Sequence, residues 1–515
     1  MTRTTRTRTP MTVALLLAVA VTAAGCSGAG SGSTSSASSA GGAGSAASRS
    51  VPLRPSSADR WHAPETDRGA AVPEVDAAEV PESTFAMDVD TASYDHARSL
   101  IEQGQRPEPD GVRPEEFVNA FRQDYPQPPG DGFTVTLDGA RVPEAQRTTP
   151  PGDVRLLRVG LQTRADDPAA RPDAALTVVI DVSGSMGDPG KLELVRNALN
   201  AFIDQARPTD SVAIVTFNDE PRVLRRMTAV RERADLHSAV DELVAEGSTN
   251  LEAGLVTGYQ VAREGFRPGA TNRVVLLSDA LANVGDTEAA PILAQVREAA
   301  AKQITMLGVA VGNDYGDALM EQLADSGDGF VVYVSTDDGA RRAFVETLPA
   351  TRSVRALDAK VQVTFDPATV TGYRLIGYDD RALRASGFRD DRVDGGEVIA
   401  GHSVTALYTV RLRPGAGGHV AHTQLRWQDP HTRKAAETGA DVTVSDLDAA
   451  FERTGSRLQV SWAAAYFAEQ LRHSGYGDQV PGTYLAQVAE SAARRTEDPA
   501  VRDLATAIRS VAADR

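Results

Sequence analysis

The apolar residues in the middle of the chain follow two alternating patterns, one typical of buried strands and one typical of helices. Residues 176–180 form a continuous run rich in β-branched side chains, as expected of a strand that is buried on both faces. Apolar residues at helical spacing predict a helix over 191–206. The same patterns predict further strands at 211–217, 223–228, 273–278, 305–311 and 329–334, and further helices at 231–244, 251–263, 291–302, 317–326 and 338–348. Strands separated by helices indicate a mostly parallel sheet covered on both faces, in which ligands bind at the carboxyl ends of the strands.

Shorter patterns of both kinds flank this central region, which we place at residues 174–350. The segment before it, 84–165, mixes strand and helix patterns. The segment after it, 353–515, has strand patterns first and helical patterns at its end. We therefore predict an α/β fold: a doubly wound, mostly parallel, Rossmann-like sheet flanked by an N-terminal α+β extension and a C-terminal extension of strands and then helices.

The first 26 residues have the pattern of a bacterial export signal. Arginines precede an apolar run over 11–24, which is shorter than the roughly 20 residues that a transmembrane helix needs. The run ends in Ala23-Ala24-Gly25-Cys26, which resembles a lipobox. This resemblance implies that residues 1–25 are a lipoprotein signal peptide and that lipidation of Cys26 holds the chain on the extracytoplasmic face of the cell membrane. A plain secretory signal with an incidental cysteine is the alternative.

Composition and charge indicate a flexible segment near the N-terminus and exclude several classes of site and ligand. Residues 27–50 are almost entirely Gly, Ser and Ala, which cannot bury enough apolar surface to fold, and we predict a flexible tether over 26–83. Cys26 is the single cysteine, so neither an internal disulfide nor a cysteine-based zinc site can form. The formal net charge of −17, from 70 acidic and 53 basic residues, argues against a nucleic-acid binder.

Side chains with oxygen ligands lie at three separate places in the central region. Asp181, Ser183 and Ser185 form a D-x-S-x-S motif directly after the strand predicted at 176–180. Thr249 precedes a predicted helix, and Asp279 ends the strand predicted at 273–278. Carboxylate and hydroxyl oxygens suit a hard cation such as Mg²⁺, so these five residues predict one divalent-cation site. A loop network in which the serines cap a helix is the alternative.

With these elements, residues 174–350 resemble a von Willebrand factor type A (VWA) domain, and the five residues resemble its metal-ion-dependent adhesion site. The resemblance implies that both serines coordinate the cation directly and that the threonine and the aspartates bind it directly or through water. It implies Mg²⁺ as the cofactor, with Mn²⁺ or Ca²⁺ as alternatives, and a protein or peptide partner whose carboxylate completes the coordination. Ala280 departs from the pattern, where Gly is usual, but removes no ligand.

Motifs on both sides extend the resemblance beyond the VWA domain. Residues 88–94 (DVDTASY) and 113–117 (RPEEF) resemble the N-terminal extension of bacterial YfbK-like VWA lipoproteins. Residues 375–378 (LIGY), 390–391 and 401–408 (GHSVTALY) resemble their C-terminal extension. The resemblance covers most of the chain from residue 84 and implies no chemistry for either extension.

Other candidate sites are weaker. Asp88 and Asp90 lack the spacing of an EF-hand, because Ala92 stands where a further acidic or amide ligand is needed. The acidic segment 390–397 is typical of a solvated loop, with a weak Ca²⁺ site as the alternative. The chain has no G-x-S-x-G elbow around Ser185, which disfavours a serine hydrolase.

Our leading hypothesis is a lipid-anchored surface protein, not an enzyme, that binds a partner through a Mg²⁺-bridged carboxylate. An envelope assembly scaffold with a purely structural metal is the second hypothesis. A hydrolase of unknown substrate is a minor third.

Overall fold

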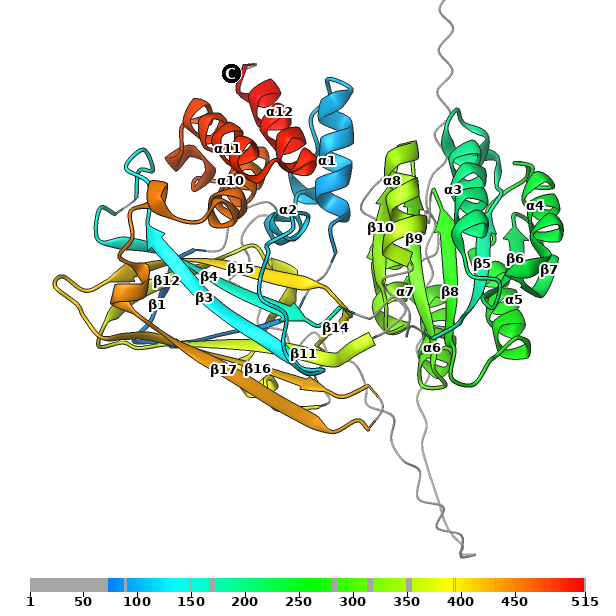
Figure 1. The fold of residues 1–515 in the computed structure, drawn as a ribbon, viewed down its shortest axis with the longest axis horizontal. Coiled ribbons are helices and arrows are strands. Elements are labelled where there is room, and N and C mark those ends of the chain that lie inside the picture. The colour runs from blue at the N-terminus through cyan, green and yellow to red at the C-terminus, as the bar shows by residue number, and fades with distance from the viewer. Residues whose placement is uncertain are drawn as a thin grey trace, which may run out of the picture. The chain divides into compact units, whose positions relative to one another are not determined.

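A computed structural model of the chain describes residues 73–513, apart from 88–89, 149, 166–171, 280–285, 313–317, 349–353, 392, 394 and 431. The predicted signal peptide, Cys26, most of the predicted tether and Ala280 lie outside the described residues. The described strands form three sheets, with helices packed around them (Figure 1). No helix among the described residues has the length and apolar character needed to cross a membrane.

One sheet forms the centre of the predicted α/β region. Its strands lie in the order β10 (Phe330–Val334), β9 (Ile304–Val311), β8 (Thr271–Ser278), β5 (Ala174–Asp181), β6 (Ser211–Phe217) and β7 (Pro221–Ala229). All neighbouring pairs are parallel except β6 and β7, which are antiparallel. Every residue of β5 is buried, which confirms the prediction from its continuous apolar run.

Helices cover both faces of this sheet. One face carries α3 (Lys191–Gln205), α4 (Arg233–Asp241) and α8 (Asp337–Arg341), and the other carries α5 (Leu251–Glu264), α6 (Asp286–Ala300) and α7 (Ala318–Ser326). The apolar side chains that predicted α3 from their spacing are all buried in the first of these cores. The doubly wound, mostly parallel fold predicted for this region is therefore confirmed.

Two glycines let α5 lie close against the sheet. A Cβ atom added at Gly258 would lie 2.3 Å from Cγ2 of Val179 on β5, and one added at Gly254 would lie 2.5 Å from Cγ of Phe217 on β6. The two glycines are one helical turn apart, so they form one groove into which both sheet residues fit. Because α5 begins directly after the loop that carries Thr249, this close packing also positions one side of the candidate site.

We expect Gly258→Leu to lower the free energy of unfolding by about 1–3 kcal/mol, because the new side chain overpacks this contact. The clash has to outweigh the gain in helix propensity, which is about 1 kcal/mol on replacing a helical glycine. Val256→Leu is the matched control, since Val256 lies on the exposed side of the same helix. Urea unfolding of both variants measures the effect, and a Gly258→Leu protein as stable as the control would refute the close packing.

The other two sheets pack face to face around a shared core. The first has the strand order β1 (Val75–Asp76), β12 (Val370–Ile376), β15 (Ser403–Leu412), β4 (Val154–Thr163) and β3 (Phe133–Arg141). The second has the order β13 (Ala382–Leu383), β2 (Glu82–Ala86), β11 (Val354–Phe365), β16 (His419–Gln428) and β17 (Ala435–Thr443), with β14 (Gly396–Ile399) also paired to β11. Each sheet combines strands from before and after the central α/β region.

A group of helices packs beside this sandwich around a core of its own. It consists of α1 (Ala92–Glu102), α2 (Pro114–Asn119), α10 (Ser456–Leu471), α11 (Gly482–Thr496) and α12 (Pro499–Ala513). Leu458, Trp462 and Tyr466, which are spaced by four residues, are all buried in it. These three residues therefore belong to the core of this group of helices.

The structure corrects one predicted boundary and joins two segments that were predicted as separate extensions. The predicted tether, 26–83, is wrong at its C-terminal end, because Val75 and Asp76 pair with β12 and Ala77 is fully buried. The segments predicted as 84–165 and 353–515 are joined by hydrogen-bonded strand pairs, β2 with β11 and β4 with β15. Periodicity identifies a strand but does not name its partner, so this pairing was not predictable from the pattern alone.

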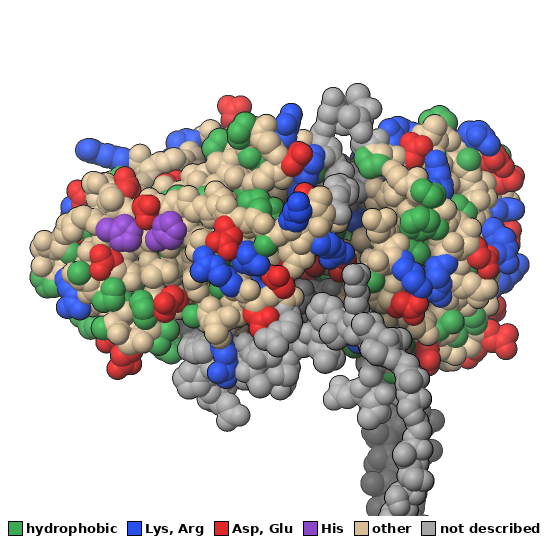
Figure 2. All heavy atoms as spheres, turned by 90° about the horizontal axis from the view of Figure 1, so that it is seen from below, with side chains coloured by type: hydrophobic (Ala, Val, Ile, Leu, Met, Phe, Trp, Pro, Cys, Tyr) green, Lys and Arg blue, Asp and Glu red, His purple; other side chains and the backbone are tan. Residues whose placement is uncertain are grey.

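The surface carries both signs of charge. Figure 2 shows Lys and Arg side chains interspersed with Asp and Glu on the face drawn, without one continuous patch of a single sign. Some of the described ion pairs join neighbouring strands, as in the contact of 3.1 Å between Arg426 on β16 and Glu437 on β17.

Candidate metal-binding site

The D-x-S-x-S motif lies at the carboxyl edge of the mostly parallel sheet, where β5 is the strand between β8 and β6. Asp181 ends β5 and is fully buried. The chain then forms a single 3₁₀ turn, Gly184–Gly187, before α3 begins. The backbone N–H of Gly184 donates to the carbonyl of Gly247 at 2.9 Å, which ties this turn to the loop before α5. The D-x-S-x-S loop therefore lies at the carboxyl ends of the parallel strands, which is where ligands of α/β sheets bind.

Hydrogen bonds join four of the five predicted residues. The Oγ atoms of Ser183 and Ser185 lie 3.2 Å apart, and Ser185 Oγ donates to Asp279 Oδ1 at 3.0 Å. Asp181 Oδ1 accepts from the backbone N–H of Ser183 at 2.8 Å. Asp279 follows β8, the strand paired with β5, so the two strand ends bring both carboxylates to one edge. Residues 98 positions apart along the chain thus form one cluster, as their places after predicted strands indicated.

Thr249 lies on the neighbouring loop but outside this cluster. Its side chain is exposed, and among the described residues the hydrogen bonds that link the other four do not reach it. Asn250, the next residue, caps α5 by accepting from the backbone N–H of Ala253 at 3.1 Å. The loop itself is adjacent to the motif, because Gly247 accepts from Gly184.

The sequence patterns missed two residues that hold the cluster. Ser278, the last residue of β8, donates its hydroxyl to Asp181 Oδ2 at 2.6 Å. Lys191, the first residue of α3, places its Nζ 2.7 Å from Asp279 Oδ2 and 3.3 Å from Asp188 Oδ2. Ser278 has a detectable signal, since it precedes Asp279 at the end of a predicted strand. Lys191 has none, because the spacing of residues does not show where a long side chain reaches.

Burial and neighbouring groups shift the pKa values of Asp181 and Lys191. Burial raises the pKa of Asp181, against the hydrogen bonds from Ser278 and Ser183, and the charge of Asp279 raises it further. Burial disfavours the charge of Lys191, but the hydrogen bond and charge of Asp279 outweigh burial and raise the pKa of Lys191 above its ordinary value. Two carboxylates at one buried strand edge therefore favour positive charge between them.

The chemistry of these donors fits a hard divalent cation. The four clustered residues offer only carboxylate and hydroxyl oxygens, which Mg²⁺ prefers. In the part of the chain that the structure describes, no group of three or more His, Cys, Asp or Glu side chains could hold a metal ion. A cation at this edge would therefore depend on the two serine hydroxyls and on water in addition to the carboxylates.

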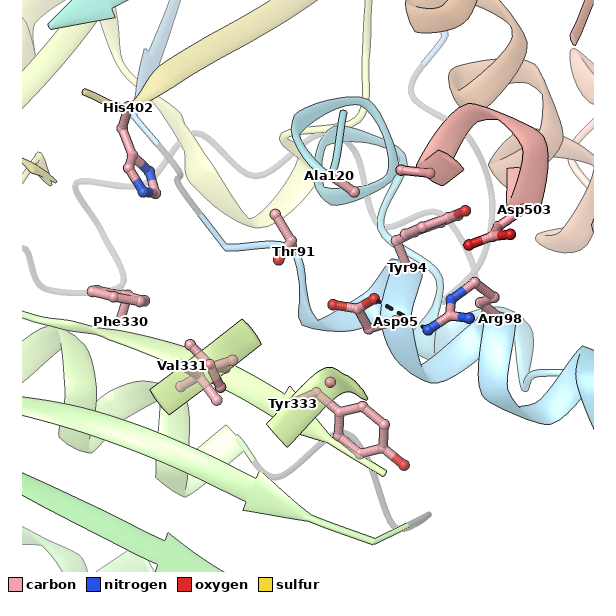
Figure 3. Close-up of a pocket in the computed structure, with 14 residues that line it drawn as sticks. Thr91, Tyr94, Asp95, Arg98, Ala120, Phe330, Val331, Tyr333, His402 and Asp503 are labelled. Carbon is pink, nitrogen blue, oxygen red and sulfur yellow. Dashed lines mark ion pairs between the residues drawn. The ribbon is translucent and has the colours of Figure 1, made fainter. Parts of the chain in front are cut away.

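A separate cavity of 280 Å³ contains none of the five predicted residues (Figure 3). It lies beside β10, α1 and α12. Arg98 and Asp95, 4.0 Å apart, face it from α1, and Arg98 also bonds Glu102 at 2.6 Å. Asp95 and Arg98 are thus partners of one another, and Tyr94, His402 and Asp503 also line the cavity.

The remaining candidates have structural partners. Asp90 accepts from the backbone N–H of Val331 on β10 at 3.2 Å and lies 3.6 Å from Arg381, so it holds the edge of the α/β sheet. Asp88 lies outside the described residues. In the acidic loop, Asp391 pairs with Arg426 at 2.7 Å.

Fold and site together define a protein built around a von Willebrand factor type A domain. Residues 175–346 match the family described as "von Willebrand factor type A domain". Residues 351–418 match "Uncharacterized protein YfbK, C-terminal", and residues 67–149 match "von Willebrand factor". The chain belongs to the family of the Escherichia coli (strain K12) protein named "Uncharacterized protein YfbK": the two are 30% identical over 450 residues, which cover 82% of this chain and 76% of that protein.

Two further matches are more distant. The chain is 27% identical over 218 residues to human inter-alpha-trypsin inhibitor heavy chain H3, which covers 40% of this chain and 24% of that protein. Among solved structures, a von Willebrand factor type A protein from Catenulispora acidiphila aligns with a TM-score of 0.41 and 17% identity, covering 68% of this chain and 81% of that one.

Proposed function

We propose that this protein is a lipid-anchored envelope protein that binds a protein or peptide partner through a divalent cation at the carboxyl edge of the VWA sheet. One observation carries the proposal: Asp181, Ser183, Ser185 and Asp279 form a single cluster of oxygen donors at the strand ends. Mg²⁺ is the proposed cation, and an Asp or Glu of the partner is the proposed further ligand. The cation would supply Lewis-acid attraction for that carboxylate.

The protein's own residues orient these donors. Asp279 accepts a hydrogen bond from the Ser185 hydroxyl, and Ser183 then donates to Ser185, so a lone pair of each hydroxyl is left for a cation. Ser278 and the backbone of Ser183 fix both oxygens of Asp181. Such preorganisation lowers the entropy lost when a ligand binds.

The cluster supports binding rather than nucleophilic catalysis. Among the described residues, the hydroxyls of Ser183 and Ser185 bond each other and Asp279, and no histidine accepts a proton from either. A serine nucleophile needs such a base. We therefore assign the site no catalytic role.

Membrane anchoring rests on the N-terminal sequence. Cys26 follows an apolar run and three small residues, and a Gly-, Ser- and Ala-rich segment separates it from the fold. A lipid on Cys26 would keep the VWA domain close to the extracytoplasmic face of the membrane, within reach of partners in the envelope.

Asp181→Asn tests the proposal. Mg²⁺ should raise the melting temperature of the unsubstituted protein and EDTA should reverse this, whereas the variant should show no Mg²⁺-dependent shift. The metal-free variant should stay folded, because the amide removes a buried charge while keeping an oxygen that accepts hydrogen bonds. Asp204→Asn, on the exposed side of α3, is the control and should respond to Mg²⁺ like the unsubstituted protein.

Crosslinking in membranes, with and without EDTA, reports on the partner. Mg²⁺-dependent capture that Asp181→Asn abolishes would support the proposal. If Asp181→Asn left both the melting shift and the capture unchanged, the site would not be the binding site. If EDTA lowered stability but left capture intact, the metal would be structural, as an assembly scaffold requires.

A further inference from the structure

Lys191 already neutralises one of the proposed metal ligands. Its Nζ lies 2.7 Å from Asp279 Oδ2, and the Asp279 side chain has an exposed fraction of 0%. The other oxygen of Asp279 accepts from Ser185. Both oxygens of this carboxylate therefore have a donor within the protein, and one of the two donors carries a full positive charge.

The stem of Lys191 is seated against the protein rather than free in solvent. The side chain is 13% exposed. At the end of β9, a Cβ atom added to Gly312 would lie 3.0 Å from Lys191 Cε, and Gly312 has a φ of +102° that few other residues adopt. The backbone at residue 312 thus leaves a channel along which the lysine stem lies on its way to Asp279.

A second carboxylate lies within reach of the same ammonium group. Asp188 Oδ2 is 3.3 Å from Lys191 Nζ, and the Asp188 side chain is 67% exposed. The ammonium group could shift toward Asp188 without losing an ionic partner. An exchange between these two acids costs less than moving a buried charge into an apolar environment.

We propose that Lys191 is a built-in competitor of the divalent cation. Its ammonium group pairs directly with Asp279, and it has to yield that carboxylate, or tolerate a like charge a few ångströms away, when the cation binds. Repulsion between such close charges is strong at a partly buried site. Lys191 therefore weakens cation binding and raises the external cation concentration that is needed to fill the site. This inference rests on the proposed function, because it presumes that the cluster binds a cation.

Lys191→Met tests the inference, because methionine keeps most of the stem and removes the charge. We expect the variant to bind Mg²⁺ about tenfold more tightly by calorimetry, and to bind Mn²⁺ more tightly by electron paramagnetic resonance. In EDTA it should melt at a lower temperature than the unsubstituted protein, because the buried Asp279 carboxylate loses its partner. Lys302→Met is the matched control: Lys302 also pairs with an acid, Glu298 at 2.6 Å, but is 57% exposed and should change neither quantity.

Two further variants separate charge from packing. Lys191→Arg keeps the charge and should keep the weak Mg²⁺ affinity, whereas Lys191→Gln removes it and should bind tightly even if the methionine variant fails to fold. Equal Mg²⁺ affinity in the unsubstituted, Gln and Met proteins, with binding abolished by Asp181→Asn, would overturn the role of Lys191 and leave the proposed function standing. If no variant bound Mg²⁺ or Mn²⁺, the proposed function would fall and the inference with it.

Discussion

Glu469→Gln should lower the free energy of unfolding by about 3 kcal/mol, because it leaves a buried guanidinium without its counter-charge. Glu469 on α10 and Arg374 on β12 are each 1% exposed and lie 2.8 Å apart. Two further nitrogens of Arg374 are buried with no hydrogen-bond partner among the described residues. The guanidinium also lies 3.7 Å from the ring centroid of Tyr476. Most of the compensation for its charge therefore comes from Glu469.

Glu490→Gln is the matched control. Glu490 pairs with Arg509 at 3.1 Å, but both side chains are substantially exposed, so the loss should stay below about 1 kcal/mol. Urea unfolding of both variants gives the comparison. The double variant Arg374→Met/Glu469→Met should recover part of the loss, since replacing a buried pair with apolar side chains is often neutral. Equal stability of the two single Gln variants would mean that the buried pair contributes no more than an exposed one.

The same pair predicts a pH dependence. Burial acts to raise the pKa of Glu469, but the charge of Arg374 and the hydrogen bond from Ser474 outweigh it and hold this pKa below the ordinary range of glutamate. A lowered folded-state pKa contributes stability that is complete above the unfolded-state value, near 4.3, and is lost as the pH falls through the lower folded-state value. The difference in stability between the unsubstituted protein and Glu469→Gln should therefore shrink on acidification below about pH 4.

The elements that were predictable from sequence are those in which the residue types themselves reflect burial. The run over 176–180 is apolar at every position because β5 is buried on both faces, and Asp181 stands out because it ends that run. By contrast, β17 lacks a clear signal in the sequence. Ala, Glu, Gly and Asp make up most of Ala435–Thr443, and much of this edge strand is exposed, so neither propensity nor a clean apolar alternation marks it.

The residues of the candidate site also differ in how far the sequence predicts them. Asp181, Ser183, Ser185 and Asp279 were predictable because they follow strands whose carboxyl ends meet at one edge. Thr249 was predicted from its loop, and the structure places that loop beside the motif while the hydroxyl stays exposed. Lys191 could not be predicted, since its role depends on a stem that reaches from α3 across Gly312 to Asp279. Local pattern locates a backbone position, whereas the reach of a side chain is a property of the folded chain.

The strands before and after the VWA domain pair with one another. The sandwich and its helices should therefore fold without that domain. The VWA segment leaves the sandwich after β4 and returns at β11, and the two points are close together. Thr163 Oγ1 at the end of β4 donates to the carbonyl of Ile399 at 2.6 Å, and Val354 at the start of β11 pairs with the same residue. A short linker can therefore bridge them, as at other tolerated insertion sites where the chain ends lie close together.

The test is to replace residues 166–353 with a short Gly- and Ser-rich linker. The remaining chain keeps the sandwich core and the helical core, so it should unfold cooperatively and keep a strand-rich circular dichroism spectrum. The excision exposes Ile399, which packs with the VWA core, and this should lower stability by about 2 kcal/mol without abolishing folding.

A second deletion serves as the control, because it removes strands instead of an insertion. Removing residues 73–90 as well takes away β1 and β2, and β2 is the neighbour of β11 through five paired residues. That loss exposes one side of β11 and the core beneath it, so the shorter chain should not unfold cooperatively. If the VWA-excised chain also lacked a cooperative transition, the sandwich would depend on the VWA domain for its stability. A folded VWA-excised chain and an unfolded β2-deleted chain would instead show that the two extensions are one folding unit into which the VWA domain is inserted.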